Sequence, residues 1–179
     1  VNLKDLDSEM EYLFNYGFDI NLIKISPYCH VITNQHKEDD LNKYKNQQGS
    51  TGKGIAPCSK DKYGRIGLRI KDLLKDNKLS NLYFKDLKFL NKNEHILKIN
   101  NLNNLLSGDI LCEGAQGFWL DIDYGNYPYV TSSTTLPYSA CSIGFPPQKI
   151  RNIYGAAKIY DTRVGVDPDF SDDLLNDNI

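Results

Sequence analysis

Hydrophobic residues recur at intervals of three and four near the start of the chain. They are Leu3, Leu6, Met10, Leu13 and Phe14. This spacing places them on one face of an α-helix. Gly17 suits the C-terminal stop of that helix, because glycine readily adopts the left-handed conformation in which helices end. The pattern predicts an amphipathic helix over residues 3–14.

Three further stretches have helical character. Residues 35–48 are polar and predict a solvated helix whose charges need no functional explanation. Residues 60–76 (KDKYGRIGLRIKDLLKD) predict a helix, although its two glycines weaken the first turns. Its inward-facing residues would be Ile66, Ile70, Leu73 and Leu74. Residues 80–106, rich in Leu, Asn and Lys, also favour a helix.

Short apolar runs between these stretches predict strands. The first run, INLIKIS at 20–26, is rich in β-branched residues and ends before a proline. The second run is 110–112, and the third is 155–165 (GAAKIYDTRVG). A brief helix is predicted at 149–153, before the third run. Strands interleaved with helices favour a mixed α/β layered architecture with a central sheet. Neither a repeat nor a linker divides the chain, so we expect a single domain over residues 1–179.

Composition narrows the functional classes. The chain has 179 residues, 40% of them hydrophobic, and a formal net charge of −2. This is enough for a hydrophobic core, and the charge argues against a general nucleic-acid binder. The sequence shows no apolar run of membrane-spanning length and no signal peptide. Four widely spaced cysteines without a CxxC motif predict reduced thiols and a cytoplasmic protein.

The segment QGSTGKGIAP at 48–57 has the composition of an anion-binding loop. It is too short between its glycines for a nucleotide-binding P-loop. Ser50, Thr51 and Lys53 would nevertheless give hydroxyl and ammonium groups to a phosphate, with a surface turn as the alternative. Arg65 and Arg69 follow with planar donor groups suited to phosphate.

The segment GAQGFWLDIDYGNYPYVTSSTT at 114–135 joins a tight turn to a run of hydroxyl side chains. Gln116 on that turn would donate to and accept from a heterocycle edge, or cap local backbone. The run 131–135 suits phosphate and ribose, or an edge strand. The spacing does not match a calcium loop. Further on, Arg163 lies near a strand end, and an ion pair with Asp161 is the structural alternative.

Taken in order, TGKGIAP, KDKYGRIGLRIKDL, EGAQGFWLDIDYGNYPYVTSSTT and AKIYDTRVG resemble the central part of the adenylosuccinate synthetase family, over residues 20–168. The resemblance implies a P-loop-NTPase-like synthetase fold. It also implies a ligase that uses GTP and Mg²⁺ to join L-aspartate to C6 of IMP through a 6-phosphoryl intermediate. The products would be adenylosuccinate, GDP and phosphate, in purine nucleotide biosynthesis.

The resemblance carries residue roles with it. Thr51 and Thr131 match threonines that hold the nucleotide 5′-phosphate, and Gln116 matches the glutamine beside the reacting purine edge. Arg65 matches an arginine that reaches across a homodimer interface to the same phosphate. Val164 matches the valine that lines the pocket for hypoxanthine and aspartate. Ser50, Lys53 and Arg163 are secondary candidates.

The sequence also departs from the family. The family's N-terminal glycine-rich loop, with its aspartate base and Mg²⁺ contacts, its catalytic histidine and its C-terminal aspartate and guanine loops are not among these residues. We therefore expect the 179 residues alone to be incomplete as a catalyst, with no metal ligands of their own. TSSTTLPYSACSIGFPP at 131–147 resembles a shorter branch, which includes phage enzymes that join aspartate to dGMP. A catalytically inert nucleotide-binding or dimerisation module is the third alternative.

Overall fold

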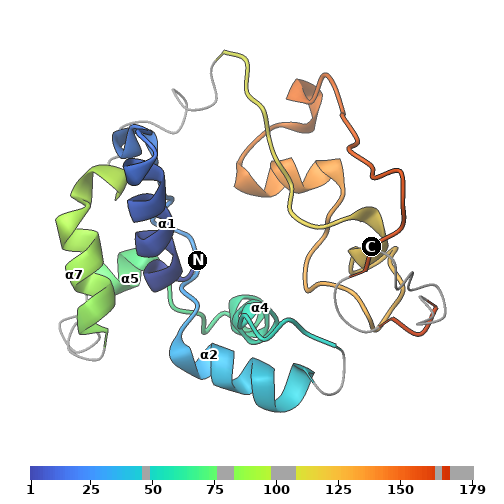
Figure 1. Cartoon of the computed structure of the whole chain (residues 1–179), viewed down its shortest axis with the longest axis horizontal. Helices are drawn as coiled ribbons and strands as arrows, with labels where there is room; N and C mark the ends of the chain where they lie inside the picture. The colour runs from blue at the N-terminus through green and yellow to red at the C-terminus, as the bar shows by residue number, and fades with distance from the viewer. Residues whose placement is uncertain (46–48, 76–82, 98–107, 164–166, 170–179) are drawn as a thin grey trace.

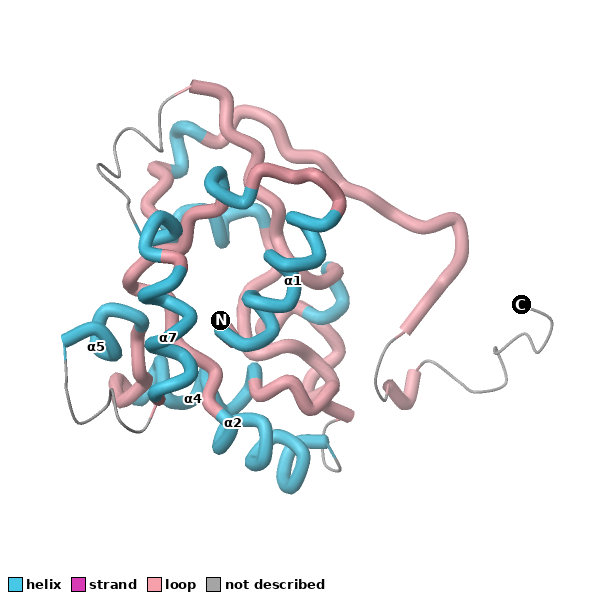
Figure 2. The backbone as a smooth tube through the Cα atoms, turned by 60° about the vertical axis from the view of Figure 1, so that its left-hand side comes forward, coloured by secondary structure: helices cyan, strands magenta, loops and turns pink. Residues whose placement is uncertain are grey.

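The structure is a computed structural model, and it describes residues 1–45, 49–75, 83–97, 108–163 and 167–169 (Figure 1). Within these ranges the chain forms helices and loops but no strand (Figure 2). Residues 1–97 carry the longer helices and the hydrophobic core. Residues from 108 onward form turns and short 3-10 helices.

The first helix, α1 (Leu3–Asn15), confirms the prediction from hydrophobic spacing. The Asn2 side chain accepts hydrogen bonds from the backbone amides of Lys4 and Asp5, both at 3.0 Å, and so starts the helix. Gly17 follows the helix with φ +83°, as expected for a helix stop. Leu3 and Met10 are buried, whereas Phe14 is exposed, so the predicted apolar face is correct only in part.

The hydrophobic core lies where α1, α5 (Ile70–Lys75) and α7 (Phe84–Lys92) surround the segment 25–31. Its buried members are Leu3, Met10, Ile25, Val31, Ile70, Leu73, Phe89, Leu90 and Ile96. Two backbone hydrogen bonds of 2.8 Å fix the segment, from the Ile25 amide to Ile96 and from the Val31 amide to Leu68. The 3-10 turn η3 (Glu94–Leu97) closes this part of the core.

Two helices pack against each other beside the core. Helix α2 (Asn34–Asp39) continues directly into a π-helical turn, η2 (Asp40–Tyr44), and both lie against α4 (Ile55–Gly64). This confirms the helix predicted from residue 35, although residues 46–48 lie outside the described part. A π-helical turn inside a helix often marks a functional position.

The helix predicted over residues 60–76 is two helices, α4 and α5, with a break between them. Arg65 adopts a left-handed conformation (φ 64°) at the end of α4, which stops the helix and changes its phase. Ile70 and Leu73 are buried as predicted. Ile66 and Leu74 are exposed, so their predicted inward orientation is wrong.

Part of the predicted helix over residues 80–106 is confirmed by α7 and η3, and residues 80–82 and 98–106 lie outside the described part. The later segment contains three 3-10 helices, η4 (Phe118–Leu120), η5 (Pro137–Ile143) and η6 (Pro147–Lys149). The last of these stands close to the brief helix predicted at 149–153. Among the described residues from 108 onward, Asp121 alone is buried.

The three strand predictions are wrong for the described residues. Residues 20–22 form a 3-10 turn, η1 (Ile20–Leu22), because the Asp19 carboxylate accepts the Asn21 amide at 3.0 Å and turns the chain. Residues 110–112 and 155–162 are exposed, and neither stretch forms a β-bridge with another described segment. An isolated antiparallel bridge joins His30 and Arg69. The predicted central sheet is therefore not present in the part of the chain that the structure describes.

Two findings concern the cellular setting. All four cysteines are free thiols, as predicted, and Cys58 is buried, which raises the pKa of its thiol. Among the described residues, none of the helices combines the length and the apolar character that crossing a bilayer would require.

Candidate functional site

The loop of residues 49–54, which we call the TGKG loop, leads directly into helix α4. The Ser50 hydroxyl accepts a hydrogen bond from the Gly52 amide at 3.3 Å, so this predicted phosphate ligand also shapes its own loop. The side chains of Thr51 and Lys53 are exposed. The loop thus presents a hydroxyl and an ammonium group to solvent at the N-terminus of a helix, where the backbone favours anions.

Two glycines hold the TGKG loop against the α2–η2 helix. Gly52 (φ +72°) lies so close to Leu41 that an added Cβ would come within 2.6 Å of its side chain. Gly54 (φ +81°) is buried, and its amide donates to the Asp40 carboxylate at 2.7 Å. Both contacts arise at the start of the π-helical turn, so the position of the loop depends on η2.

Arg65 lies at the opposite end of α4 from the TGKG loop and is exposed. The helix has 10 residues, and at a rise of about 1.5 Å per residue it separates its two ends by roughly 15 Å. Arg65 and the TGKG loop are therefore well separated within one chain. Arg69, which the sequence also singled out, pairs with Asp72 at 3.3 Å.

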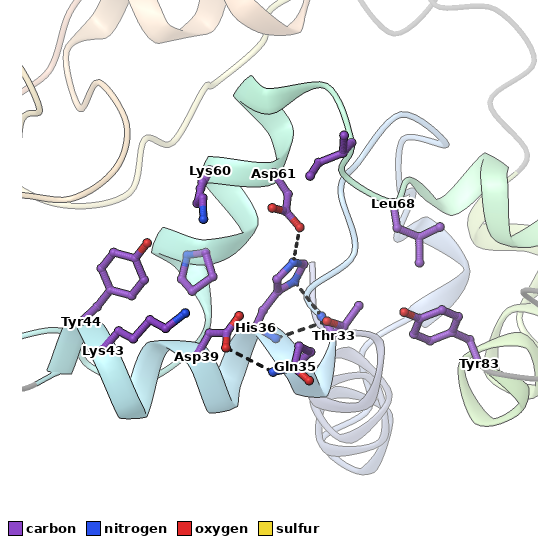
Figure 3. A pocket seen from close by; sticks show the side chains of 12 residues that line it. Thr33, Gln35, His36, Asp39, Lys43, Tyr44, Lys60, Asp61, Leu68 and Tyr83 are labelled. Atoms are coloured by element: carbon purple, nitrogen blue, oxygen red, sulfur yellow. Dashed lines mark hydrogen bonds and ion pairs between the residues drawn. The ribbon is translucent and has the colours of Figure 1, made fainter.

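A polar pocket of about 280 Å³ lies between α2–η2 and α4 (Figure 3). The His36 ring connects the two helices at this pocket. Its Nδ1 accepts the Thr33 amide at 3.1 Å, so the neutral ring donates from Nε2 to the Asp61 carboxylate, also at 3.1 Å. Both ring nitrogens are thus engaged, and His36 fixes α2 against α4 rather than offering a free acid or base.

The segment 117–135 is organised around the buried carboxylate of Asp121. Its Oδ1 accepts the backbone amides of Asp123 (3.0 Å) and Tyr124 (3.1 Å). Its Oδ2 accepts the Thr135 amide (2.7 Å) and the Thr134 hydroxyl (2.9 Å). We call these five residues the Asp121 network. Burial alone would raise the pKa of the Asp121 carboxyl, but these hydrogen bonds outweigh burial and lower the pKa to about 2.

The Asp121 network changes the interpretation of the hydroxyl run at 131–135. Thr134 and Thr135 face the carboxylate, so they stabilise the turn and are not open to a ligand. The Thr131 amide donates to the Leu120 carbonyl at 2.8 Å, while its side chain makes no hydrogen bond to another described residue. Thr131 therefore keeps a hydroxyl for a ligand on a backbone that is fixed.

Gln116 is held in a left-handed conformation (φ 75°) just before the 3-10 helix η4, and its side chain is exposed. Positive φ is uncommon outside glycine and often accompanies a functional position. The Leu120 amide donates to Gly117 at 3.0 Å, and the Leu120 carbonyl accepts from Thr131. The structure thus attaches Gln116 and Thr131 to one short turn, as a shared ligand site requires.

The aromatic residues within this turn are not buried. Phe118 and Trp119 are both exposed, in spite of their apolar character, and their rings pack edge to face at 5.2 Å between centroids. The Asn126 amide donates to the Trp119 carbonyl. The segment 117–135 is therefore held together by polar contacts and not by an apolar core.

Arg163 donates to the Tyr129 carbonyl at 2.6 Å and forms an ion pair with Asp167 at 3.5 Å. The structural alternative predicted for this arginine was an ion pair with Asp161. The structure shows an ion pair, but its partner is Asp167. These contacts tie the residues after 160 to the segment that bears Thr131. Val164 lies outside the described residues.

Three buried polar residues at these sites were not recognised as candidates in the sequence: His36, Asp40 and Asp121. The spacing of Thr33 and His36 could have indicated a helix cap. His36 is the third helical residue, and from this position a side chain can accept the backbone amide of the N-cap residue, Thr33. Asp40 had no such signal, because the amide that it accepts comes from Gly54, 14 positions away. Asp121 accepts amides two and three positions ahead, a local pattern that aspartate favours in turns, but its contact with the Thr135 amide spans 14 positions.

Within the described ranges, no three His, Cys, Asp or Glu side chains come close enough together to hold an ion.

Comparison with known proteins gives a consistent result. The family model of adenylosuccinate synthetase matches residues 1–108 and 94–177. An adenylosuccinate synthetase of Malacoplasma penetrans is 36% identical over 212 residues, which cover 100% of this chain and 50% of that protein. One from Helicobacter acinonychis is 38% identical and covers 97% and 49% of the two chains. The chain thus spans about half the length of the curated relatives it matches.

The solved structures agree with the sequences. A structure of fully ligated adenylosuccinate synthetase from Plasmodium falciparum superposes with a TM-score of 0.72 at 30% sequence identity, over 93% of this chain and 47% of that one. This supports the synthetase fold that the resemblance predicted. On these matches, together with the TGKG loop and the turn that bears Gln116 and Thr131, the chain belongs to the adenylosuccinate synthetase family.

Proposed function

We propose that this chain forms the nucleoside-monophosphate side of an enzyme of purine nucleotide biosynthesis that ligates L-aspartate to C6 of IMP. The reaction would consume GTP and give adenylosuccinate, GDP and phosphate. The observation that carries the proposal is the match of the whole chain to adenylosuccinate synthetases, with Thr51, Gln116 and Thr131 all on fixed backbone and all presenting polar groups.

The proposed roles follow from the chemistry of each side chain. Thr51 and Thr131, with Ser50 and Lys53 beside them, bind the 5′-phosphate, because hydroxyl and ammonium donors suit phosphate oxygens. Gln116 holds the purine edge, since its amide both donates and accepts. A substrate anchored by its phosphate uses remote binding energy to place the ring at the reacting centre. Val164 and Arg163 are proposed for the pocket that holds the base and aspartate.

We propose that Arg65 contacts the phosphate bound by a second copy of the chain. The support is its position, at the far end of α4 from the TGKG loop and exposed to solvent. A twofold homodimer would place each Arg65 beside the other chain's loop, because such an interface pairs the same surfaces reciprocally. The protein would then have two composite sites.

The energetically difficult step is phosphoryl transfer from GTP to the purine oxygen. Catalysis of such a step depends on positioning and on neutralising charge, and Mg²⁺ supplies part of that charge in the family. The described residues contribute substrate positioning only. We propose that the Mg²⁺ and GTP contacts belong to residues outside the described part, and a cytoplasmic location is consistent with this metabolic role.

A second substrate, dGMP, is favoured by one local feature. The run TSSTTLPYSACSIGFPP contains the 3-10 helix η5 (Pro137–Ile143), in a place where the sequence departs from the family pattern. This departure is shared with the branch whose phage members act on dGMP. A catalytically inert nucleotide-binding module is the alternative from a different class.

The test measures phosphate release from GTP by the product of the complete reading frame with L-aspartate, in parallel reactions with IMP and with dGMP. Release that depends on IMP supports the main proposal, whereas release that depends on dGMP supports the second. Binding of either nucleotide should be measured in the same preparations by calorimetry, with a Thr51→Ala variant as control. Nucleotide binding without phosphate release would favour the inert module, and absence of both would refute all three proposals.

A further inference from the structure

We infer that Asp40 is a positioning residue for the 5′-phosphate site, acting through the backbone of the TGKG loop. The inference deepens the proposed function and rests on it. Asp40 itself would not touch the nucleotide. Its carboxylate would set the place of the loop that does.

The contact on which this inference depends is short and buried. Asp40 is 1% exposed, and its Oδ2 accepts the Gly54 amide at 2.7 Å. No other described residue donates to the second oxygen, Oδ1. A buried carboxylate with a single hydrogen bond is costly to keep, so the fold retains this group at an energetic disadvantage. Such a residue suggests a functional role beyond stability.

Gly54 is tightly packed against the chain before and within helix α2. The position lies 2.8 Å from the Ile32 side chain and 3.1 Å from the Lys37 amide, measured from an added Cβ. The next residue along the π-helical turn, Leu41, packs against Gly52 in the same loop. Two consecutive residues of η2 therefore hold two glycines of the loop, one through a polar and one through an apolar contact.

The electrostatic arrangement supports a role in positioning rather than binding. Gly54 is the N-cap of α4, so its amide lies at the positive end of the helix. The buried Asp40 carboxylate accepts the hydrogen bond of that amide. The exposed side chains of Thr51 and Lys53 remain on the solvent side, free to meet an anion. A ligand phosphate and Asp40 would thus use different groups of one loop.

The test compares three variants of the 179-residue chain. Asp40→Ala removes the acceptor for the Gly54 amide, while Asp40→Asn keeps an oxygen that can accept it. Asp39→Ala is the matched control, because Asp39 neighbours Asp40 on the same helix but bonds to Gln35 at 3.1 Å, beside the pocket and away from the loop. Calorimetry measures the affinity for IMP, for dGMP and for ribose 5-phosphate, which shares the 5′-phosphate without the base.

Asp40→Ala should lower the affinity for each ligand that the unmodified chain binds. The factor should be the same for all of them, about 10- to 100-fold, because the loss of a charge-assisted hydrogen bond is of that size. Asp40→Asn should restore most of the affinity, and Asp39→Ala should match the unmodified chain. Hydrogen exchange at the Gly54 amide supplies the structural readout. Its protection should fall in Asp40→Ala and persist in the other two variants.

Several results would overturn the inference. If Asp40→Ala loses protection at the Gly54 amide but keeps its affinity for ribose 5-phosphate, the contact between Asp40 and Gly54 does not position the phosphate site. Equal losses in Asp40→Asn and Asp40→Ala would show that the hydrogen bond is not the cause. A general loss of helical circular dichroism in both Asp40 variants would assign Asp40 to folding alone. Absence of binding by the unmodified chain would instead refute the proposed function, and the inference with it.

Discussion

Replacing Gly54 with alanine tests whether the TGKG loop is packed against α2–η2 as the structure shows. Gly54 has φ +81°, and an added Cβ would lie 2.8 Å from Ile32 Cγ2, 3.1 Å from the Lys37 amide nitrogen and 3.2 Å from the His36 carbonyl carbon. Two of these atoms belong to the backbone of a helix, which cannot move aside as a flexible side chain can.

The expected cost has two parts. A left-handed conformation costs a non-glycine residue roughly 1–2 kcal/mol, and forcing a methyl group into a packed site costs about 1–3 kcal/mol. Gly54→Ala should therefore lower the free energy of unfolding by about 2–5 kcal/mol. Gly17→Ala is a matched control, because Gly17 has φ +83° and no atom within 4 Å of an added Cβ. It should lose only the conformational part.

Urea unfolding followed by far-UV circular dichroism measures both variants. The difference between them isolates the steric part, because the effect of alanine on the unfolded chain is the same at both positions and cancels. A difference of about 1–3 kcal/mol would agree with the packing. Equal stability of the two variants would refute the reasoning, since the loop would then lie away from the helix.

The remaining predictions address the network, the core and the proposed dimer. Because the Asp121 pKa is lowered to about 2 from an ordinary 3.8, its stabilisation should be complete above pH 3.8 and be lost as the pH falls toward 2. Fluorescence of Trp119, the single tryptophan, should report this loss, and Asp121→Asn should abolish its pH dependence. Leu90→Ala, at a fully buried position, should cost about 2–5 kcal/mol in urea unfolding, and a value near zero would contradict the core assignment. Under the proposed function, mixing Arg65→Ala and Thr51→Ala versions of the complete reading frame's product should restore about a quarter of the unmodified protein's phosphate release, because half of the dimers are mixed and each has one intact site. No restoration would count against the trans role.

The sequence predicted local features well where a single element decides them. The spacing of Leu3 and Met10 predicted α1, and Gly17 predicted its end. The burial of Ile70 and Leu73 also followed from spacing. The break between α4 and α5 was not predicted, because it depends on Arg65 adopting a left-handed conformation that the residue type does not favour.

The strand predictions failed for a physical reason that local pattern does not contain. A β-branched run favours extended backbone, but a strand also requires a second segment that completes its hydrogen bonds. Residues 110–112 and 155–162 are exposed, and no described segment forms a β-bridge with them. Leu111 and Ile159 are accordingly 85% and 102% exposed. The sequence contains only the local preference, whereas the partner is a property of the whole fold.

The sequence singled out candidate ligand-facing residues, whose roles stay predictions, and did not single out the residues that support them. Thr51, Gln116 and Thr131 were found because hydroxyl, amide and glycine clusters are visible along the chain. Asp40 accepts the Gly54 amide, 14 positions away, and Asp121 joins amides two and three positions ahead to the Thr135 amide, 14 positions ahead. A carboxylate that accepts amides from a distant turn has the same sequence appearance as a solvated one, so only the folded structure distinguishes the two.

The two halves of the proposed monophosphate site should therefore fail under different conditions. The TGKG loop is attached to helices that pack beside the hydrophobic core, so urea and core substitutions should release it. Gln116 and Thr131 are attached to a turn whose buried centre is the Asp121 carboxylate, so acid should release them first. If phosphate binding requires both halves, acid should abolish it while the helical signal of residues 1–97 persists. Loss of binding and of helix at the same pH would instead show that the two halves form one cooperative unit.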